Sequence, residues 1–428
     1  MANSKAKAKR LTWFAAIGPG ILVAATGVGA GDLATATLAG AKLGTAVLWA
    51  VLIGALIKFI LNEGLTRWQL ATGTTILEGT AKHIPQSVQW LFLIYLFVWS
   101  YLVAMALMSA CGVAAVAIFP FFSDTTTGKI VFGIAHSFLA CGLVLIGGYK
   151  LFEKIMSVCI GVMFLVVVIT AIALSPGFLE ILYGMSVPTI PQMFEGGIGW
   201  TIALLGGVGG TVTVLCYGYW IRESGRDSIA ELNVCRIDLG VGYGMTAVFG
   251  LSMVIIGSQL GELDAKGATL IVEVARTLEE RLGGWGIAGK WAFLIGAWGA
   301  VFSSLFGVWQ SVPYLFTDFW RLQLGNQSPQ ADSRSPLYRA HLAALAIVPI
   351  SGLFLFDFST AMKVNGVVGA LFIPMLAGVL LALNGNANWI GSQNVNRGLT
   401  KLSLIAALLI FIFAGTLQVL KVFSATSI

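Results

Sequence analysis

Long apolar runs separated by short polar connections dominate this chain. Eleven of these runs approach or exceed the roughly 20 residues that a helix needs to cross about 30 Å of hydrocarbon. They predict membrane-spanning helices over residues 13–38, 45–63, 88–119, 128–148, 152–175, 198–221, 237–258, 291–317, 341–358, 362–383 and 401–421. Charged residues fall mostly between these spans. We therefore expect an all-α membrane protein surrounded by the lipid bilayer.

The composition supports this interpretation. Of the 428 residues, 57% are hydrophobic and only 10% are charged, which excludes a water-soluble domain of this length. With the N-terminus inside, the predicted cytoplasmic segments hold about twice as many Lys and Arg residues as the external ones. This asymmetry predicts a multi-pass protein of the inner (plasma) membrane with a cytoplasmic N-terminus and an external C-terminus. It also accounts for the net charge of +6 without a nucleic-acid partner.

Glycine is concentrated in the first and sixth spans, at residues 27–31 and 206–210. A continuous helix through either run would lose much stability, so both helices are expected to be interrupted. The two spans stand five helices apart, which is typical of a LeuT-type 5+5 inverted repeat. We expect one transmembrane domain over 1–428. It divides into a cytoplasmic tail (1–12), a first repeat (13–175), a second repeat (198–383) and an additional eleventh helix (401–421).

Asp32 follows the first glycine run inside a predicted membrane span. A carboxylate there is costly unless a cation, protein dipoles or water offset its desolvation. Asp32 is either a ligand for a passing cation, in a site completed by carbonyl groups that the interrupted helices leave unpaired, or a structural acid that is protonated or locally paired. Gly210 and Thr213 lie at the corresponding place in the sixth span. In the tenth span, the amide of Asn365 could bind a cation or a neighbouring helix.

Other polar residues indicate structure rather than chemistry. Glu63 and Arg67 are spaced for an ordinary i,i+4 ion pair, and Asp318 with Arg321 suits an interfacial anchor or an ion pair. The cysteines and histidines show no metal-binding spacing, and no nucleophile triad or phosphate-binding loop occurs. We therefore expect neither an enzyme nor a resident cofactor.

Two segments resemble the NRAMP family of divalent metal transporters. Residues 18–20 read Gly-Pro-Gly, and after eight residues they are followed by Gly-Ala-Gly-Asp at 29–32, where the family has Asp-Pro-Gly-Asn. Residues 209–213, Gly-Gly-Thr-Val-Thr, are similar to the family's Gly-Ala-Thr-Val-Met. In this register Gly29 replaces the metal-binding Asp, Asp32 replaces the Asn, and Thr213 replaces the soft Met ligand.

The resemblance implies a divalent metal ion as substrate and a site formed by Asp32, Gly29, Thr213, Gly210 and Asn365. Loss of the thioether leaves oxygen ligands, which suit Mg²⁺ or Mn²⁺ better than softer metals. Glycine at position 29 would leave room for a retained water, and Mg²⁺ usually keeps several. The closest resemblance is therefore to NRAMP-related magnesium transporters.

The family's proton route is not present in this sequence. The third span from Trp99 to Gly112 contains no Asp, Glu or His, and Leu215 occupies the place of the family's histidine. We therefore expect alternating access by a monomer without proton coupling.

Two other functions remain open at this point. One is an organic-solute or amino-acid transporter of the same fold, possibly driven by sodium. The other is a membrane sensor or assembly subunit in which Asp32 pairs with another polypeptide.

Overall fold

The computed structural model describes residues 18–29, 31–260, 268–325 and 333–425. Within these ranges the regular structure is helical and contains no strand, which confirms the all-α prediction. The predicted cytoplasmic tail and the start of the first span lie outside the described residues.

Most elements follow the predicted spans closely, although the second helix continues nine residues further than expected, to Thr72. In chain order they are α2 (Gly18–Gly27), the π-helical turn η1 (Gly31–Thr35), α3 (Ala36–Leu43), α4 (Leu48–Thr72), α5 (Ile76–His83), α6 (Gln86–Ile118), α7 (Thr125–Ala173), α8 (Phe178–Ser186), α9 (Ile198–Gly207), the 3₁₀ turn η4 (Val212–Cys216), α10 (Tyr217–Glu223), α11 (Leu232–Ser258), α12 (Ala268–Arg281), α13 (Gly286–Gln323), α14 (Pro336–Ile347), α15 (Ile350–Leu355), α16 (Phe358–Ala370), α17 (Phe372–Leu383), α18 (Ala387–Ile390) and α19 (Gly398–Ala425).

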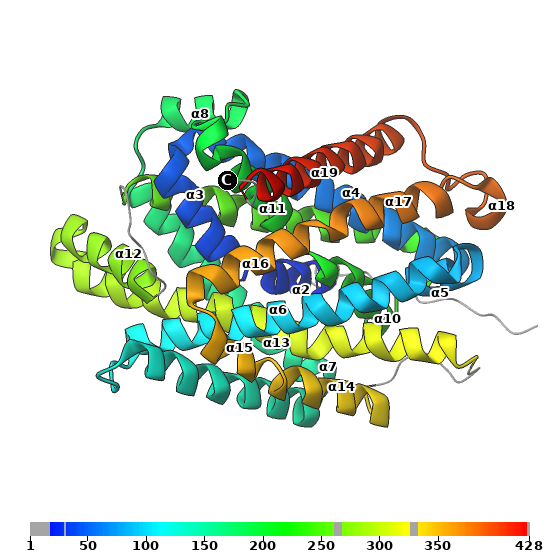
Figure 1. Ribbon diagram of the computed structural model, residues 1–428, viewed down its shortest axis with the longest axis horizontal. Helices are drawn as coiled ribbons and strands as arrows, with labels where there is room; N and C mark the ends of the chain where they lie inside the picture. The colour runs from blue at the N-terminus through cyan, green and yellow to red at the C-terminus, as the bar shows by residue number, and fades with distance from the viewer. Residues whose placement is uncertain (1–17, 30, 261–267, 326–332, 426–428) are drawn as a thin grey trace, which may run out of the picture.

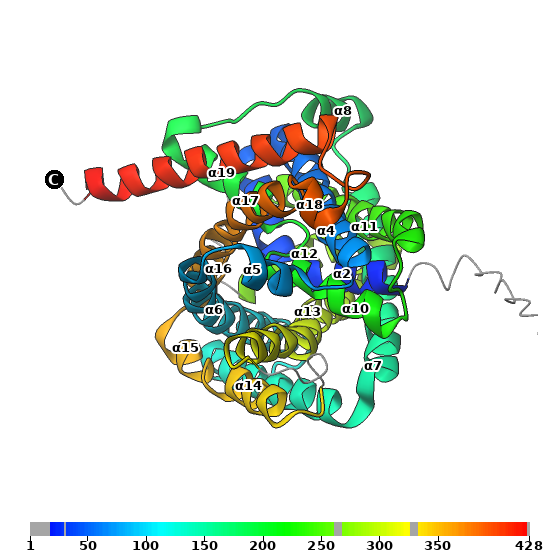
Figure 2. The ribbon, with the colours of Figure 1, turned by 90° about the vertical axis from the view of Figure 1, so that its right-hand side faces the viewer.

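These helices account for the eleven predicted spans. Among the described residues, eight apolar helical stretches are long enough to cross a membrane, and two shorter ones lie at Gly18–Gly27 and Gly398–Phe413. One of the eight, α7, contains two spans because the chain turns at Gly148, where φ is 59° and ψ is −175°. Only glycine adopts that conformation readily. Figure 2 shows the two arms of α7 running in different directions.

The first and sixth helices are both interrupted, as the glycine runs predict. The first helix stops at Gly27 and resumes at η1. The sixth stops at Gly207, passes through Gly209 and Gly210 with φ of 83° and 79°, and resumes at η4. Positive φ at two consecutive residues is incompatible with a continuous right-handed helix. The backbone groups at these breaks are therefore available to other partners.

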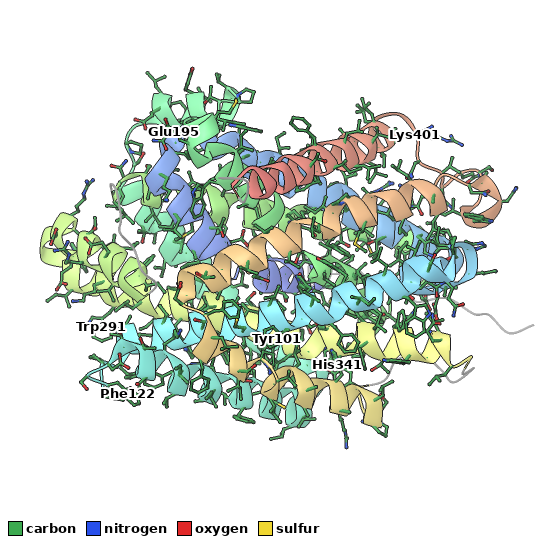
Figure 3. The ribbon with its side chains drawn as sticks, viewed as in Figure 1. Tyr101, Phe122, Glu195, Trp291, His341 and Lys401 are labelled. Atoms are coloured by element: carbon green, nitrogen blue, oxygen red, sulfur yellow. The ribbon has the colours of Figure 1, made fainter. Side chains whose placement is uncertain are left out.

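The broken first helix lies at the centre of the bundle. Figure 1 shows α2 in the middle of the molecule, with α16 crossing it in this view, and α11, α13 and α7 pack against α2. The added helix α19 lies at the periphery against α17, where Figure 3 places Lys401. The short helix α12 packs on α13 and buries Ile271, Val274 and Leu278. The two breaks are consequently enclosed by other helices.

Candidate functional site

The two helix breaks touch each other. A Cβ added to Gly27 would lie 2.8 Å from the carbonyl carbon of Gly209, and one added to Gly210 would lie 3.3 Å from the Cα of Gly27. A side chain at Gly27 would therefore force the two helices apart, and one at Gly210 would crowd Gly27. Glycine at both breaks allows the backbones to approach and form one shared junction.

Asp32 lies at this junction, on η1. Its side chain is buried, and its Oδ2 accepts a long hydrogen bond of 3.4 Å from the backbone N–H of Gly209. Its Oδ1 has no hydrogen-bond partner among the described residues. An ionised carboxylate can accept about four hydrogen bonds, so this one retains most of its capacity for a ligand.

Lys58, from α4, faces the same junction and is completely buried. Its Nζ donates to the carbonyl oxygen of Gly206 at 2.9 Å and to that of Val208 at 2.6 Å. Lys58 and Asp32 attract each other electrostatically, although no direct hydrogen bond joins these two described side chains. No role for Lys58 was predicted from the sequence. The signal available was a lone charge inside an apolar span, which requires a buried partner.

Gly29 does not provide the open space that the sequence predicts for a retained water. A Cβ added to Gly29 would lie 2.1 Å from Oγ of Ser304 in α13. That hydroxyl donates to the carbonyl of Thr26 at 2.5 Å, and Ser303 next to it donates to Ala25 at 3.0 Å. The serines of α13 therefore satisfy carbonyls at the end of α2 and fill the volume beside Gly29.

Gly210 and Thr213 lie together on the other side of the junction. Thr213 is buried on η4, and its Oγ1 would be 2.4 Å from a Cβ added to Gly210. Between them, Thr211 accepts a hydrogen bond of 2.9 Å from Nε1 of Trp99 in α6. The hydroxyl of Thr213 thus stands beside the break, and that of Thr211 is used to hold the break against α6.

Asn365 lies on α16, which packs against both α9 and η1. Its Oδ1 is buried and has no hydrogen-bond partner among the described residues. Within the described ranges there is also no group of three His, Cys, Asp or Glu side chains that could hold a metal ion. A cation at this junction would therefore meet one carboxylate and neutral oxygen atoms, two of which Lys58 already binds.

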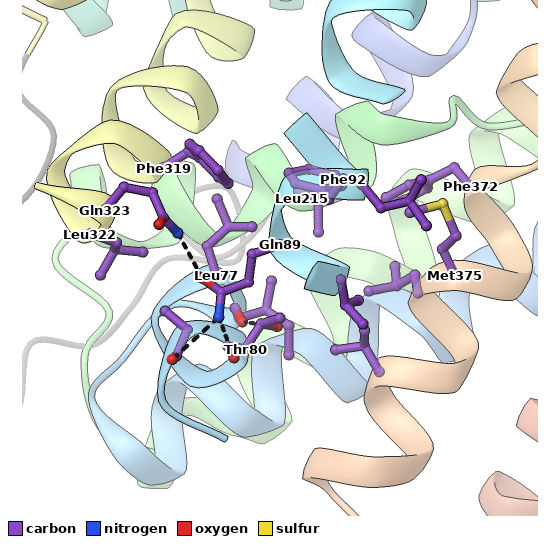
Figure 4. A pocket seen from close by; sticks show the side chains of 16 residues that line it. Leu77, Thr80, Gln89, Phe92, Leu215, Phe319, Leu322, Gln323, Phe372 and Met375 are labelled. Atoms are coloured by element: carbon purple, nitrogen blue, oxygen red, sulfur yellow. Dashed lines mark hydrogen bonds between the residues drawn. The ribbon is translucent and has the colours of Figure 1, made fainter. Parts of the chain in front are cut away.

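An apolar cavity lies apart from the junction. It has a volume of about 150 Å³ and is lined by α5, α6, α13, α17 and Leu215. Figure 4 shows Phe92, Phe319 and Phe372 around it, with Gln323 donating to Gln89 at 2.7 Å. None of the five candidate residues, all of which the structure describes, lines this cavity. Its apolar wall cannot coordinate an ion.

The ion pairs predicted from local spacing are present. Arg67 pairs with Glu63, and Arg321 pairs with Asp318 at 2.7 Å. Glu63 also forms an ion pair with Arg236 of α11, with 2.7 Å between the guanidinium nitrogen and the carboxylate oxygen. This contact joins distant segments, so sequence spacing could not reveal it. These acids have basic partners and belong to the framework around the site.

The chain belongs to the Nramp family. A family model described as natural resistance-associated macrophage protein-like matches residues 20–420. The resemblance seen in the sequence is thereby confirmed, and the protein is a multi-pass membrane transporter rather than an enzyme.

Curated relatives are distant. The divalent metal cation transporter MntH of Klebsiella pneumoniae (strain 342) is 24% identical over 299 residues, covering 65% of this chain and 67% of its own length. The divalent metal cation transporter MntH of Chromohalobacter salexigens is 24% identical over 278 residues, covering 60% of this chain and 61% of its own length.

Solved structures extend the likeness over nearly the whole chain. A variant of the Eremococcus coleocola manganese transporter superposes with a TM-score of 0.75 at 17% identity, covering 98% of this chain and 88% of that one. MhsT in complex with L-phenylalanine superposes with a TM-score of 0.64 at 16% identity, covering 95% and 99%. At such identities the likeness shows the fold. It confirms the LeuT-type 5+5 inverted repeat, and α19 is the additional helix.

Proposed function

We propose that the protein carries a divalent metal cation across the membrane by alternating access, with Asp32 as its charged ligand. The observation that carries the proposal is the buried carboxylate with an unpartnered Oδ1 at the junction of two broken helices. Relatives named as divalent metal cation transporters and a manganese transporter of the same fold support it.

The chemistry of the donors favours Mg²⁺ or Mn²⁺. The predicted ligands Asp32, Thr213, Asn365 and the backbone at Gly29 and Gly210 offer oxygen and no thioether, and hard cations prefer oxygen ligands. Mg²⁺ keeps several of its waters in protein sites. A single carboxylate with neutral oxygens therefore suits a partly hydrated cation better than a fully stripped one.

We further propose that transport is driven by the cation gradient and the membrane potential, without proton coupling. The buried face of α6 between Trp99 and Gly112 carries no Asp, Glu or His. Leu215 lines the apolar cavity instead of supplying an ionisable group. A membrane potential supplies about 2.3 kcal/mol per elementary charge for each 100 mV, which is enough to drive a divalent cation inward.

The test is uptake of Mn²⁺ and Mg²⁺ into proteoliposomes. Asp32→Ala should reduce uptake to background while the protein remains folded and extractable, whereas Asp227→Ala, at an exposed loop acid, should leave uptake unchanged. An internal pH dye should stay constant during uptake. Full uptake by Asp32→Ala would remove this residue from the site, and acidification dependent on the metal would refute the uncoupled mechanism.

One observation favours a second candidate, a transporter of a zwitterionic solute such as an amino acid. Asp32 and Lys58 present opposite charges at the junction, as a solute with an ammonium and a carboxylate would require. MhsT, of the same fold, was solved with L-phenylalanine. Amino acids that compete with Mn²⁺, or that are taken up without metal, would favour this candidate.

The remaining predictions complete the proposal. The single transmembrane domain acts as a monomer in the plasma membrane, with its N-terminus cytoplasmic and its C-terminus external, in accordance with the distribution of Lys and Arg. Labelling of single cysteines placed at each terminus from one side of sealed cells tests the orientation.

A further inference from the structure

A buried lysine donates hydrogen bonds to the carbonyl oxygens at the broken end of α9. Lys58 reaches from α4 to donate to Gly206 and Val208, at 2.9 and 2.6 Å, and none of its surface is exposed. The last carbonyls of a helix have no partner within the helix, and at an interruption inside a membrane they cannot all be reached by bulk water. The lysine therefore fills a cation site that the helix break creates.

The arrangement around Nζ differs from that of the molecule's structural ion pairs. Arg226 and Asp238 bind each other directly, at 2.9 Å. Lys58 instead binds two neutral carbonyls and feels the Asp32 charge without a hydrogen bond to it. Carbonyl oxygens at interrupted helix ends also bind small monovalent cations in membrane transporters. The flexible four-carbon stem allows the ammonium to enter or leave such a place.

We propose that Lys58 is a tethered cation that occupies this site in the empty transporter and must be displaced by the cargo. The inference rests on the proposed function, because it concerns the same junction. With Asp32 ionised and Lys58 charged, the junction is neutral. A divalent cation entering beside both would leave two uncompensated charges in a low-dielectric interior, which is strongly unfavourable.

Displacement makes the lysine a specificity-determining residue. A monovalent cation that replaces the ammonium gains no more attraction to Asp32 than the ammonium already has. A divalent cation gains about twice that attraction, so only the divalent ion offsets the loss of the two carbonyl hydrogen bonds. Lys58 should therefore lower the apparent affinity for every cation and exclude monovalent ions most strongly.

The experiment removes the side chain and replaces its atoms with a free amine. Lys58→Ala deletes three carbons and the ammonium, which n-propylammonium supplies. The unfolding temperature of the purified full-length Lys58→Ala variant in detergent should then rise with n-propylammonium. It should not rise with 1-propanol, the uncharged equivalent. Neither compound should shift the wild type, Lys154→Ala at an exposed lysine of α7, or the double variant Asp32→Asn with Lys58→Ala.

The outcomes distinguish an ammonium that fills a cation site from a lysine side chain that only stabilises the packing of α4 against α9. If Lys58→Ala is recovered as folded protein only when n-propylammonium is present, the proposal stands. It is overturned if the amine gives no shift, gives the same shift in the double variant, or fails to recover the protein.

A second measurement separates this inference from the proposed function. The KM for Mn²⁺ uptake should fall at least about tenfold in Lys58→Gln, because the site is no longer occupied by a competing group. Na⁺ should inhibit that variant and not the wild type. If uptake depends on Asp32 but its KM is unchanged in Lys58→Gln, the tethered-cation proposal is contradicted and the proposed function is not. Absence of divalent uptake in every variant contradicts the proposed function, and the amine shift then tests the ammonium site by itself.

Discussion

Two buried aspartates of this protein differ in how completely their oxygens are used. On α11, Asp238 accepts from Gly20 N–H on Oδ1 at 2.8 Å, and on Oδ2 from Tyr217 at 2.8 Å and Arg226 at 2.9 Å. At the helix breaks, Asp32 accepts one long bond from Gly209 and leaves Oδ1 unpartnered among the described residues. Both side chains are almost fully buried.

The difference shows what each region is built to do. The acid on α11 connects the start of α2, the start of α10 and the loop that follows α10, so its charge is fully engaged in holding those segments together. The acid at the breaks holds little and keeps capacity for another ligand. A buried carboxylate whose oxygens lack hydrogen-bond partners is costly, and membrane proteins keep such groups mainly for function.

Asp238→Ala is expected to have the largest effect on stability. It leaves the Arg226 guanidinium buried without this partner, and breaking a buried pair in this way costs about 3–5 kcal/mol. Asp32→Asn should cost less, because it breaks no direct ion pair and the Lys58 ammonium retains its two carbonyl partners. Unfolding of both variants in detergent with added denaturant measures the difference. Equal losses would contradict the distinction between a framework acid and a site acid.

Gly210→Ala should disturb the sixth-helix break through the backbone. Its φ of 79° strains an alanine, and the new Cβ would meet Oγ1 of Thr213, so we expect a loss of about 1–3 kcal/mol together with reduced uptake. Gly244→Ala is the matched control on the continuous helix α11, where a Cβ meets open space. It should stabilise the protein by about 0.5–1 kcal/mol. Similar effects at the two positions would mean that the sixth-helix break is not held by glycine.

Asp124 provides an exposed carboxylate as a reference, with the smallest expected effect. It caps α7, and hydrogen bonds from the Thr127 hydroxyl and from the backbone N–H groups of Thr127 and Thr126 lower its pKa. A carboxyl with a lower pKa in the folded state adds stability above its unfolded pKa, and this stability is lost as pH falls through the folded pKa. In Asp124→Ala the melting temperature should therefore fall less steeply as the pH is lowered through the acid range. The same fall as in the wild type would contradict this.

Much of the fold could be predicted from sequence because its determinants are local. Span length follows from hydropathy, and both helix breaks follow from runs of glycine that disfavour a helix. The Glu63–Arg67 pair was predictable for the same reason, since i,i+4 spacing places the two side chains together. The exception among local features is α4, which continues past the apolar run to Thr72 because Glu63 and Arg67 find partners inside the bundle.

The surroundings of Asp32 depend on tertiary contacts and were not predictable. Lys58 meets carbonyls about 150 residues away, and Ser304 fills the space beside Gly29 from 275 positions further along the chain. Neither distance leaves a pattern in one sequence. The carbonyl partners of Lys58 are visible only in the packing of α4 against α9.

Anomalous X-ray scattering from crystals soaked in Mn²⁺ would show whether Asp32 binds the cation. We expect a Mn²⁺ peak at the junction of α2, η1 and α9, bound to Oδ1 of Asp32 directly or through one water, with Lys58 withdrawn from Gly206 and Val208. The peak should be absent in Asp32→Asn. A peak elsewhere in the bundle, or one that persists at the junction in Asp32→Asn, would contradict the assignment of this carboxylate as the ligand.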